Sequence, residues 1–285
     1  MAKFFKKATS RSIEENSTIL PAKGLRIRGP LAKFFAMLKE NLDIIQSKLK
    51  PGSKMLDIGG WASPLHRANY VMDMAPYETH IRNSDKHNPH HRMDMPEQFS
   101  ADTWIVRDIC AREPYPFKDK ELDFVVCSHT LEDIRDPIWV CSEMARISKA
   151  GYIEVPSRLV ETCRGVNRDC PVGYYHHRWM VEVEGKAVRF TQKTGIIFNH
   201  WSYSFPRKYL WSLSPDQRVT YLFWEGTFEA TEVSSHDKEE IKKELAGYVA
   251  KHHPYPAWRF QAEETMASLN RGRRAIKKVF KRKRS

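Results

Sequence analysis

The chain has 285 residues, 41% of them hydrophobic and 29% charged, which suits a globular protein with one substantial core and an appendage. It has no uninterrupted apolar run of about 18 residues, and its basic start, residues 1–11, lacks the apolar stretch of a secretory signal. We therefore expect a cytoplasmic location. The five cysteines are odd in number and irregularly spaced, which favours reduced thiols. Cys127 and Cys141 lie in apolar segments and are predicted core residues.

The formal net charge is +12, but nine basic residues fall within residues 271–284, a stretch without an acid. The rest of the chain is nearly balanced, which argues against a nucleic-acid-binding groove. Ile276, Val279 and Phe280 interleave with the basic residues. This pattern predicts either an amphipathic helix on an anionic membrane surface, here the inner membrane face, or a disordered tail.

The first half of the chain alternates predicted strands with connections. An irregular lead-in over residues 1–30 precedes an amphipathic helix within 31–49. Strands are predicted at 54–58, 68–72, 103–106, 122–127 and 150–155, with a long polar covering segment over 74–102 and a helix over 137–148. Strands that alternate with such connections imply a parallel sheet.

The second half has a different pattern. It contains a loop-like stretch at 163–179, a hairpin of strands at 180–184 and 187–191, a β-rich run at 219–233, and helices at 235–250 and from 257. We expect this β-rich part to be antiparallel and appended to the parallel sheet. The fold class is therefore α/β, doubly wound and Rossmann-like, with a mostly parallel sheet, an appended β-rich region and C-terminal helices.

Four regions follow from these patterns. They are a basic lead-in and helix over 1–50, a cofactor-binding core over 51–160, a β-rich acceptor or cap region over 161–234 that completes the sheet, and C-terminal helices with a basic tail over 235–285.

Glycines and acids stand just beyond two predicted strands. Asp57, Gly59 and Gly60 come at the end of the first strand, and Asp73 ends the second. Ligands of open parallel sheets bind at the carboxyl ends of the strands. Glycine lets the backbone approach a ligand closely, and an acid at the end of the second strand can accept both ribose hydroxyls of an adenosine. The pattern indicates a nucleoside-containing cofactor.

Residues 54–156 resemble a class I S-adenosylmethionine-dependent methyltransferase. The first motif, Leu56-Asp57-Ile58-Gly59-Gly60-Trp61-Ala62-Ser63-Pro64, is similar to that of the type 11 branch associated with bacterial cell-surface polysaccharide synthesis. The resemblance implies S-adenosylmethionine as cofactor, with Asp57, Gly59 and Gly60 against its methionine part and Asp73 on its ribose. The remaining implied cofactor-binding residues are Trp61, Met74, Asp108, Ile109, Ser128 and His129. Of these, the resemblance places Asp108 and Ile109 on either side of the adenine.

Two residues depart from the pattern of these methyltransferases. Trp61 stands where glycine is usual, so the loop must turn with a bulkier side chain or follow another path. Asp133 follows Leu131 and Glu132 where many relatives carry histidine, and we expect it to cap the next helix.

Methyl transfer needs in-line placement of the acceptor, and a general base only when the acceptor must lose a proton. His129 is the candidate catalytic base because it follows the fourth strand; the alternative is that it only hydrogen-bonds a loop. His176, His177 and Trp179 are candidate acceptor contacts suited to a sugar or another polar small molecule.

Residues near the candidate site also have purely structural explanations. Structural packing is the alternative for Tyr174, Tyr175 and Trp179. Glu154 and Glu161 flank the exit of the fifth strand, and we expect both to be solvated rather than to orient an acceptor hydroxyl.

Two groups contain zinc-type ligands, but neither has the compact paired spacing of a structural zinc site. The first group is His87, His90, His91 and Asp94; the second is Cys163, Cys170, His176 and His177. We expect no metal.

The sequence thus predicts a methyltransferase that acts on oxygen or nitrogen of a small-molecule, sugar or lipid-linked glycan acceptor. Two alternatives remain open. One is a noncatalytic binding protein with this fold, suggested by Trp61, and the other is a nucleic-acid methyltransferase anchored by its basic tail.

Overall fold

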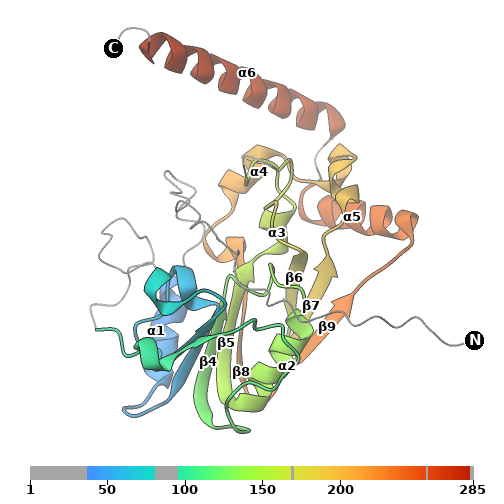
Figure 1. Ribbon diagram of the computed structural model, residues 1–285. Coiled ribbons are helices and arrows are strands. Elements are labelled where there is room, and N and C mark those ends of the chain that lie inside the picture. The colour runs from blue at the N-terminus through green and yellow to red at the C-terminus, as the bar shows by residue number, and fades with distance from the viewer. Residues whose placement is uncertain (1–36, 81–95, 168–169, 255, 283–285) are drawn as a thin grey trace, which may run out of the picture.

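The computed structural model describes residues 37–80, 96–167, 170–254 and 256–282 (Figure 1). The lead-in, the start of the predicted first helix and the histidine group at 87–94 lie outside these residues. Elsewhere every predicted strand is present within a few residues of its expected bounds. Between residues 74 and 102, the described parts contain only short 3₁₀ turns, Tyr77–Thr79 and the start of Ala101–Thr103.

The centre of the molecule is a six-stranded sheet with the order β3-β2-β1-β4-β5-β8 (Figure 1). Its strands are β1 (Met55–Ile58), β2 (Tyr70–Asp73), β3 (Trp104–Val106), β4 (Leu122–Ser128), β5 (Ser148–Pro156) and β8 (Val219–Glu225). The first five are parallel, and β8 pairs with β5 in the antiparallel sense. Strand order reverses between β1 and β4, which is where open α/β sheets bind ligands. The predicted Rossmann-like fold is confirmed.

Both faces of this sheet are covered. Helix α1 (Lys39–Lys48) buries Leu42 and Ile45 against one face. Helix α2 (Pro137–Ile147) and a second sheet cover the other face. Cys127 and Cys141 are both buried on this second side, as predicted from their apolar surroundings. Because both faces are covered, β4 is almost continuously apolar.

The second sheet has the order β6-β7-β9 and consists of β6 (Trp179–Glu184), β7 (Ala187–Gln192) and β9 (Glu229–Val233). The predicted β6–β7 hairpin is confirmed, but the prediction of a wholly antiparallel region is wrong because β9 runs parallel to β7. The run at 219–233 divides between the two sheets. Trp224 and Phe228 are buried with their ring centroids 5.0 Å apart, and their packing turns the chain from one sheet to the other.

Helices α3 (Arg158–Glu161), α4 (Arg207–Ser212) and α5 (Lys238–His252) pack together beyond the carboxyl ends of the strands (Figure 1). Helix α5 begins after Asp237, whose carboxylate accepts the N–H groups of Glu239 and Glu240. These helices and the loops between them form a cap over the edge of the sheet at which the predicted site lies.

The last helix, α6 (Ala257–Arg282), extends away from the body (Figure 1). Its first turn is anchored because Phe260 is buried, with its ring centroid 5.8 Å from that of Trp201 and the guanidinium of Arg164 5.3 Å away. The helix continues to Arg282, which agrees with the helical alternative for the basic tail. Among the described helices, none combines the length and apolar character that crossing a membrane requires.

Candidate active site

The turn after β1 holds two tightly packed glycines. Gly59 has a φ of +77°, and a Cβ on it would lie 2.1 Å from Oγ1 of Thr130, in the loop after β4. A Cβ on Gly60 would lie 2.7 Å from Oδ2 of Asp57. Only glycine fits at these positions, so the turn brings backbone, rather than side chains, to the strand ends.

Asp57 supports this turn from beneath. Its carboxylate is buried and accepts the N–H of Leu65 at 2.8 Å. Burial raises the pKa of Asp57 to about 7; the Leu65 hydrogen bond opposes this shift, and the nearby Asp73 adds to it. Asp57 therefore ties Leu65, at the far end of this loop, to the end of β1.

The loop after β1 contains Trp61 at the position where similar methyltransferases usually have glycine. Its backbone N–H donates to Oδ2 of Asp73 at 3.2 Å, and its indole N–H donates to the carbonyl and hydroxyl oxygens of Thr79, each at 3.0 Å. The side chain thus leans toward the turn after β2 and stays 36% exposed. The loop follows a 3₁₀ path, Gly60–Ala62, that accommodates the bulky residue.

Asp73 ends β2 as predicted and is half-buried. Its carboxylate accepts the N–H groups of Ala75 at 2.9 Å and of Trp61. Burial raises its pKa, while these hydrogen bonds oppose the shift. A carboxylate has about four acceptor positions, so Asp73 retains the capacity to accept hydroxyl donors.

Exposed apolar side chains surround Asp73. Met74 is 72% exposed and Val106, the register partner of Asp73 on β3, is 56% exposed. Together with Trp61 they form an apolar rim at the carboxyl ends of β1–β3. Sequence reasoning missed Val106, although its position as the last apolar residue of a predicted strand was a usable signal.

The two residues expected to flank an adenine differ in placement. Asp108 forms an ion pair of 2.6 Å with Arg135 and accepts the N–H of Cys110 at 2.9 Å. Ile109 is buried in the core, where its carbonyl accepts the hydroxyl of Tyr115 at 2.8 Å. Asp108 therefore stays near the surface, whereas the side chain of Ile109 contributes to packing.

His129 follows Ser128 at the end of β4. Its φ is +52°, which is uncommon for a residue other than glycine, and its N–H donates to the carbonyl of Glu154 at 2.7 Å. Nε2 lies 3.2 Å from Oε1 of Glu154, and Nδ1 lies 3.8 Å from Oε1 of Glu132. The imidazole therefore lies between the side chains of Glu132 and Glu154. The alternative that His129 only hydrogen-bonds a loop does not account for these two contacts.

Glu154 is completely buried, so the expectation that it is solvated is wrong. Its Oε2 accepts the hydroxyl of Tyr152 and the N–H of Leu38, the latter at 3.2 Å. The Tyr152 hydroxyl in turn accepts from Asn41 on α1 at 2.7 Å. Helix α1 thus covers the end of β5, a contact between residues more than a hundred positions apart.

Glu161 is also completely buried, so the same correction applies. Its carboxylate contacts Nδ1 of His177 at 2.7 Å and Nζ of Lys193 at 2.9 Å. Burial raises the pKa of Glu161, but the two basic partners outweigh burial and hold it below its usual range. The loop at 163–179 and the residue after β7 together cover this charge.

Asp133 does not cap α2; Asp136 does, with its carboxylate accepting the N–H of Trp139 at 3.1 Å. The oxygens of Asp133 instead face two histidines, with Oδ1 3.6 Å from Nε2 of His177 and Oδ2 3.9 Å from Nε2 of His176. Burial raises the pKa of Asp133, and His177 and His176 oppose the shift.

Backbone hydrogen bonds bring the histidine loop to the end of β4. The N–H groups of Arg178 and Trp179 both donate to the carbonyl of Glu132, at 2.7 and 3.1 Å. Burial raises the pKa of the Glu132 carboxyl well above its usual range. The residues that meet here are some forty positions apart, so neither spacing nor periodicity signalled the cluster.

The predicted acceptor contacts separate into buried and exposed residues. Trp179 is only 8% exposed, and its indole N–H donates to the carbonyl of Ile134 at 2.9 Å, so it is a packing residue. Tyr174 is buried as well, whereas Tyr175 and His176 are exposed. His176, rather than Trp179, is therefore available to an acceptor.

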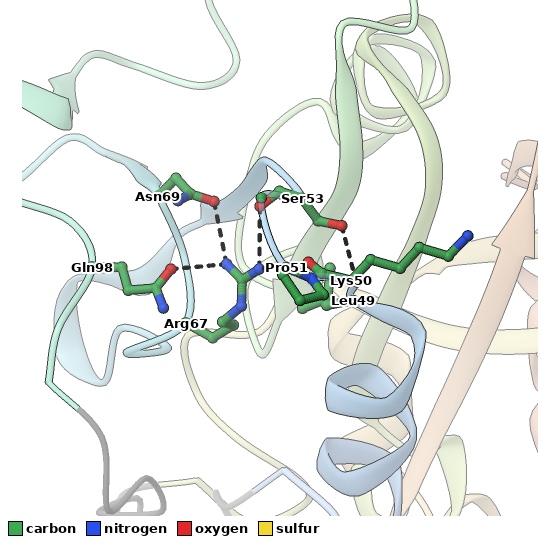
Figure 2. Close-up of a pocket in the computed structure, with 8 residues that line it drawn as sticks. Leu49, Lys50, Pro51, Ser53, Arg67, Asn69 and Gln98 are labelled. Carbon is green, nitrogen blue, oxygen red and sulfur yellow. Dashed lines mark hydrogen bonds between the residues drawn. The ribbon is translucent and has the colours of Figure 1, made fainter.

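A cavity of about 330 Å³ lies elsewhere, at the amino ends of β1 and β2 (Figure 2). There the guanidinium of Arg67 donates to Gln98 at 2.9 Å and to the carbonyl of Ser53 at 3.2 Å. The cavity is on the opposite edge of the sheet from the acids and glycines described above, so we do not assign the cofactor to it.

Comparison with known proteins gives one family. Residues 60–153 match the family model described as "Methyltransferase domain", a segment that runs from the glycine turn after β1 into β5. No curated protein matches the chain.

Solved structures with similar folds include three methyltransferase structures. A putative methyltransferase from Bacillus halodurans C-125 is 18% identical, over 41% of this chain and 50% of that one, with a TM-score of 0.29. An S-adenosylmethionine-dependent methyltransferase from Aquifex aeolicus is 17% identical, over 50% and 71%, with a TM-score of 0.31. The N-terminal domain of EvdMO1, determined with S-adenosylhomocysteine and D-fucose, is 14% identical, over 50% and 57%, with a TM-score of 0.30.

Of these three structures, the chain spans half the length of the first, 71% of the second and 57% of the third.

Proposed function

We propose that this chain, whose residues 60–153 are a class I S-adenosylmethionine-dependent methyltransferase domain, transfers the methyl group of that cofactor to oxygen or nitrogen of a small-molecule, sugar or lipid-linked glycan acceptor. The observation that carries the proposal is the family match over the segment that supplies the glycine turn, Asp73 and the end of β4. S-adenosylmethionine is the cofactor of such domains. A link to polysaccharide synthesis is part of the proposal.

The residues at the ends of β1–β3 fit this cofactor. Asp73 has acceptor positions left for the ribose hydroxyls, which are donors. The apolar rim of Trp61, Met74 and Val106 offers a surface for the adenine ring. Gly59 and Gly60 leave room for the methionine part, because no side chain occupies the turn.

When bound, S-adenosylmethionine supplies an electrophilic methyl group on a sulfonium. The chain must hold the acceptor in line with it and accept a proton if the acceptor carries one. We assign proton acceptance to His129, because its ring lies at the end of β4 and two carboxylates, Glu132 and Glu154, flank it.

We assign the acceptor side to the region 161–234. His176 and Tyr175 are exposed beside the end of β4, and polar and aromatic side chains of this kind suit a sugar-like ligand. His177 and Trp179, which are buried, support this surface from below rather than contacting the acceptor.

We also propose that the protein is cytoplasmic and that α6 attaches it to the anionic inner face of the membrane. Trp258, Met266 and Leu269 are exposed at helical spacing, and nine basic residues follow within 271–284. Removal of residues 271–285 should abolish co-sedimentation with phosphatidylserine vesicles, while binding to phosphatidylcholine vesicles stays negligible for both proteins. Equal co-sedimentation of the two proteins would rule out this contact.

Isothermal titration with S-adenosylmethionine and S-adenosylhomocysteine tests the cofactor site. We expect micromolar binding, and a loss of about 1–3 kcal/mol for Asp73→Ala if two charge-assisted hydrogen bonds disappear. Asp102→Ala, which removes an exposed aspartate before β3, is the matched control and should bind normally. Absence of binding by the folded wild-type chain would instead favour a noncatalytic binding protein.

Release of S-adenosylhomocysteine in the presence of candidate acceptors tests catalysis. His129→Gln should lower the turnover rate by about 10²- to 10⁴-fold, the usual contribution of a general base, and weaken S-adenosylhomocysteine binding by much less than this. An unchanged rate would remove His129 from the reaction.

A further inference from the structure

Three ligand-type side chains converge beside the proposed acceptor surface. The carboxylate of Asp133 and the imidazoles of His176 and His177 each offer one atom, and these atoms all lie within 4.8 Å of one another. His177 and Asp133 come from different segments, joined by the hydrogen bonds of Arg178 and Trp179 to the carbonyl of Glu132. These backbone hydrogen bonds hold the segments of His177 and Asp133 together, and the exposed side chain of His176 lies beside them.

The separations within the cluster do not correspond to direct hydrogen bonds. Nε2 of His177 and of His176 lie 3.6 and 3.9 Å from the two oxygens of Asp133. Oδ1 of Asp133 is buried and accepts no hydrogen bond from the described residues. Ligand atoms about 2.0–2.2 Å from a tetrahedral ion are about 3.3–3.6 Å apart. The separation between His177 and Asp133 matches this range, and the separation between His176 and Asp133 is slightly longer. The three ligand atoms therefore come close to the spacing that a shared cation requires.

The ring of His177 is held in one orientation by a neighbouring carboxylate, as the rings of metal-binding histidines usually are. Its Nδ1 contacts Oε1 of Glu161 at 2.7 Å, and Glu161 is completely buried. A hydrogen bond from Nδ1 to a carboxylate leaves the lone pair on Nε2, the nitrogen that faces Asp133. Lys193, 2.9 Å from the other oxygen of Glu161, neutralises that carboxylate and keeps it in place.

We propose that Asp133, His176 and His177 bind a divalent transition-metal ion of the zinc type. Imidazole nitrogens favour zinc and its neighbours over magnesium or calcium, which prefer oxygen ligands. This proposal differs from the sequence-based expectation that the chain binds no metal. In the proposed site Asp133, rather than Cys163 and Cys170, is grouped with the two histidines. The two thiols instead donate to the carbonyls of Leu159 and Val172.

Three protein ligands leave a fourth position for an oxygen ligand, as in catalytic zinc sites. A role for this position rests on the proposed function: an acceptor hydroxyl bound there would lose its proton more readily. The proton would pass to His129, the oxygen would form a bond to the methyl carbon, and the bond from that carbon to sulfur would break to release S-adenosylhomocysteine.

The test uses the full-length chain, stripped with a chelator and then titrated with Zn²⁺ and with Co²⁺. Bound metal is measured by mass spectrometry, and the visible absorption of Co²⁺ reports nitrogen and oxygen ligation. We expect one equivalent per chain, and affinity at least about 100-fold weaker for both His176→Ala and Asp133→Asn. Glu161→Gln should weaken binding by about 10- to 100-fold, as expected for a residue that orients a ligand. His236→Ala, an exposed histidine elsewhere, should bind as wild type.

His176 is exposed, so its replacement should leave the fold intact, which circular dichroism checks. Failure of the wild-type chain to retain metal, or retention of the full equivalent by both His176→Ala and Asp133→Asn, would overturn the proposal. Titration of the metal-free chain with S-adenosylhomocysteine separates the two proposals. Cofactor binding without metal binding would reject the metal site alone, and metal binding without cofactor binding would reject the methyltransferase activity alone.

Discussion

The carboxyl ends of β1–β3 and those of β4 and β5 share one edge of the sheet but differ in chemistry. Around Asp73 the surface is apolar and exposed, with Trp61, Met74 and Val106 as its rim. Around His129 the side chains are charged and largely buried. The first region is built from consecutive turns that follow strands, whereas the second requires residues from α1, the loop at 163–179 and the end of β7.

This difference explains why we assign cofactor binding to the ends of β1–β3 and acid–base chemistry to the ends of β4 and β5. A ligand with a nucleoside needs an apolar surface and a few acceptors, which short local motifs can supply. Acid–base chemistry requires charged groups held away from water, and only the cap over β4 and β5 provides such burial. Gly59 joins the two regions because it packs directly against Thr130.

The largest loss of stability is expected for a substitution among the buried charges at the ends of β4 and β5. Glu161→Ala would leave Lys193 buried without its carboxylate partner, so we expect the free energy of unfolding to fall by about 3–5 kcal/mol. Urea unfolding measures this, with Glu184→Ala as control because the Glu184–Arg189 pair is exposed and should matter little. A loss below about 1 kcal/mol for Glu161→Ala would show that the buried charges do not stabilise this region.

A smaller effect is expected for Asp57, beneath the apolar region. Its pKa is raised to about 7, so the folded chain keeps a proton that the unfolded chain loses above about pH 4. The contribution of Asp57 to stability therefore falls as pH rises from about 4 to 7 and is level above that. Urea unfolding of wild type and Asp57→Asn should show the variant gaining about 2–3 kcal/mol relative to wild type between pH 5 and pH 7.5. Parallel curves for the two proteins would contradict this assignment.

The smallest effect concerns the contact between the two regions. Gly59→Ala should destabilise the chain more than Gly52→Ala, by about 1–3 kcal/mol, the cost of overpacking. Both glycines have positive φ, but a Cβ on Gly52 meets nothing within 4 Å, so the pair separates steric overlap from backbone strain. Equal losses for the two variants would mean that Thr130 moves aside and that the regions are not rigidly joined.

The sequence by itself determined the doubly wound sheet, the bounds of most strands, and the placement of Gly59 and Asp73 at strand ends. These features depend on local patterns, since apolar runs, turns and glycines act over a few residues. The tertiary structure alone decided that Glu154 and Glu161 are buried, that Trp179 packs inside, that β9 joins a second sheet, and that Asp133 meets His176 and His177. Those outcomes depend on which distant segments cover the ends of β4 and β5, and a side chain's burial and charge partners are fixed only when that cover is in place.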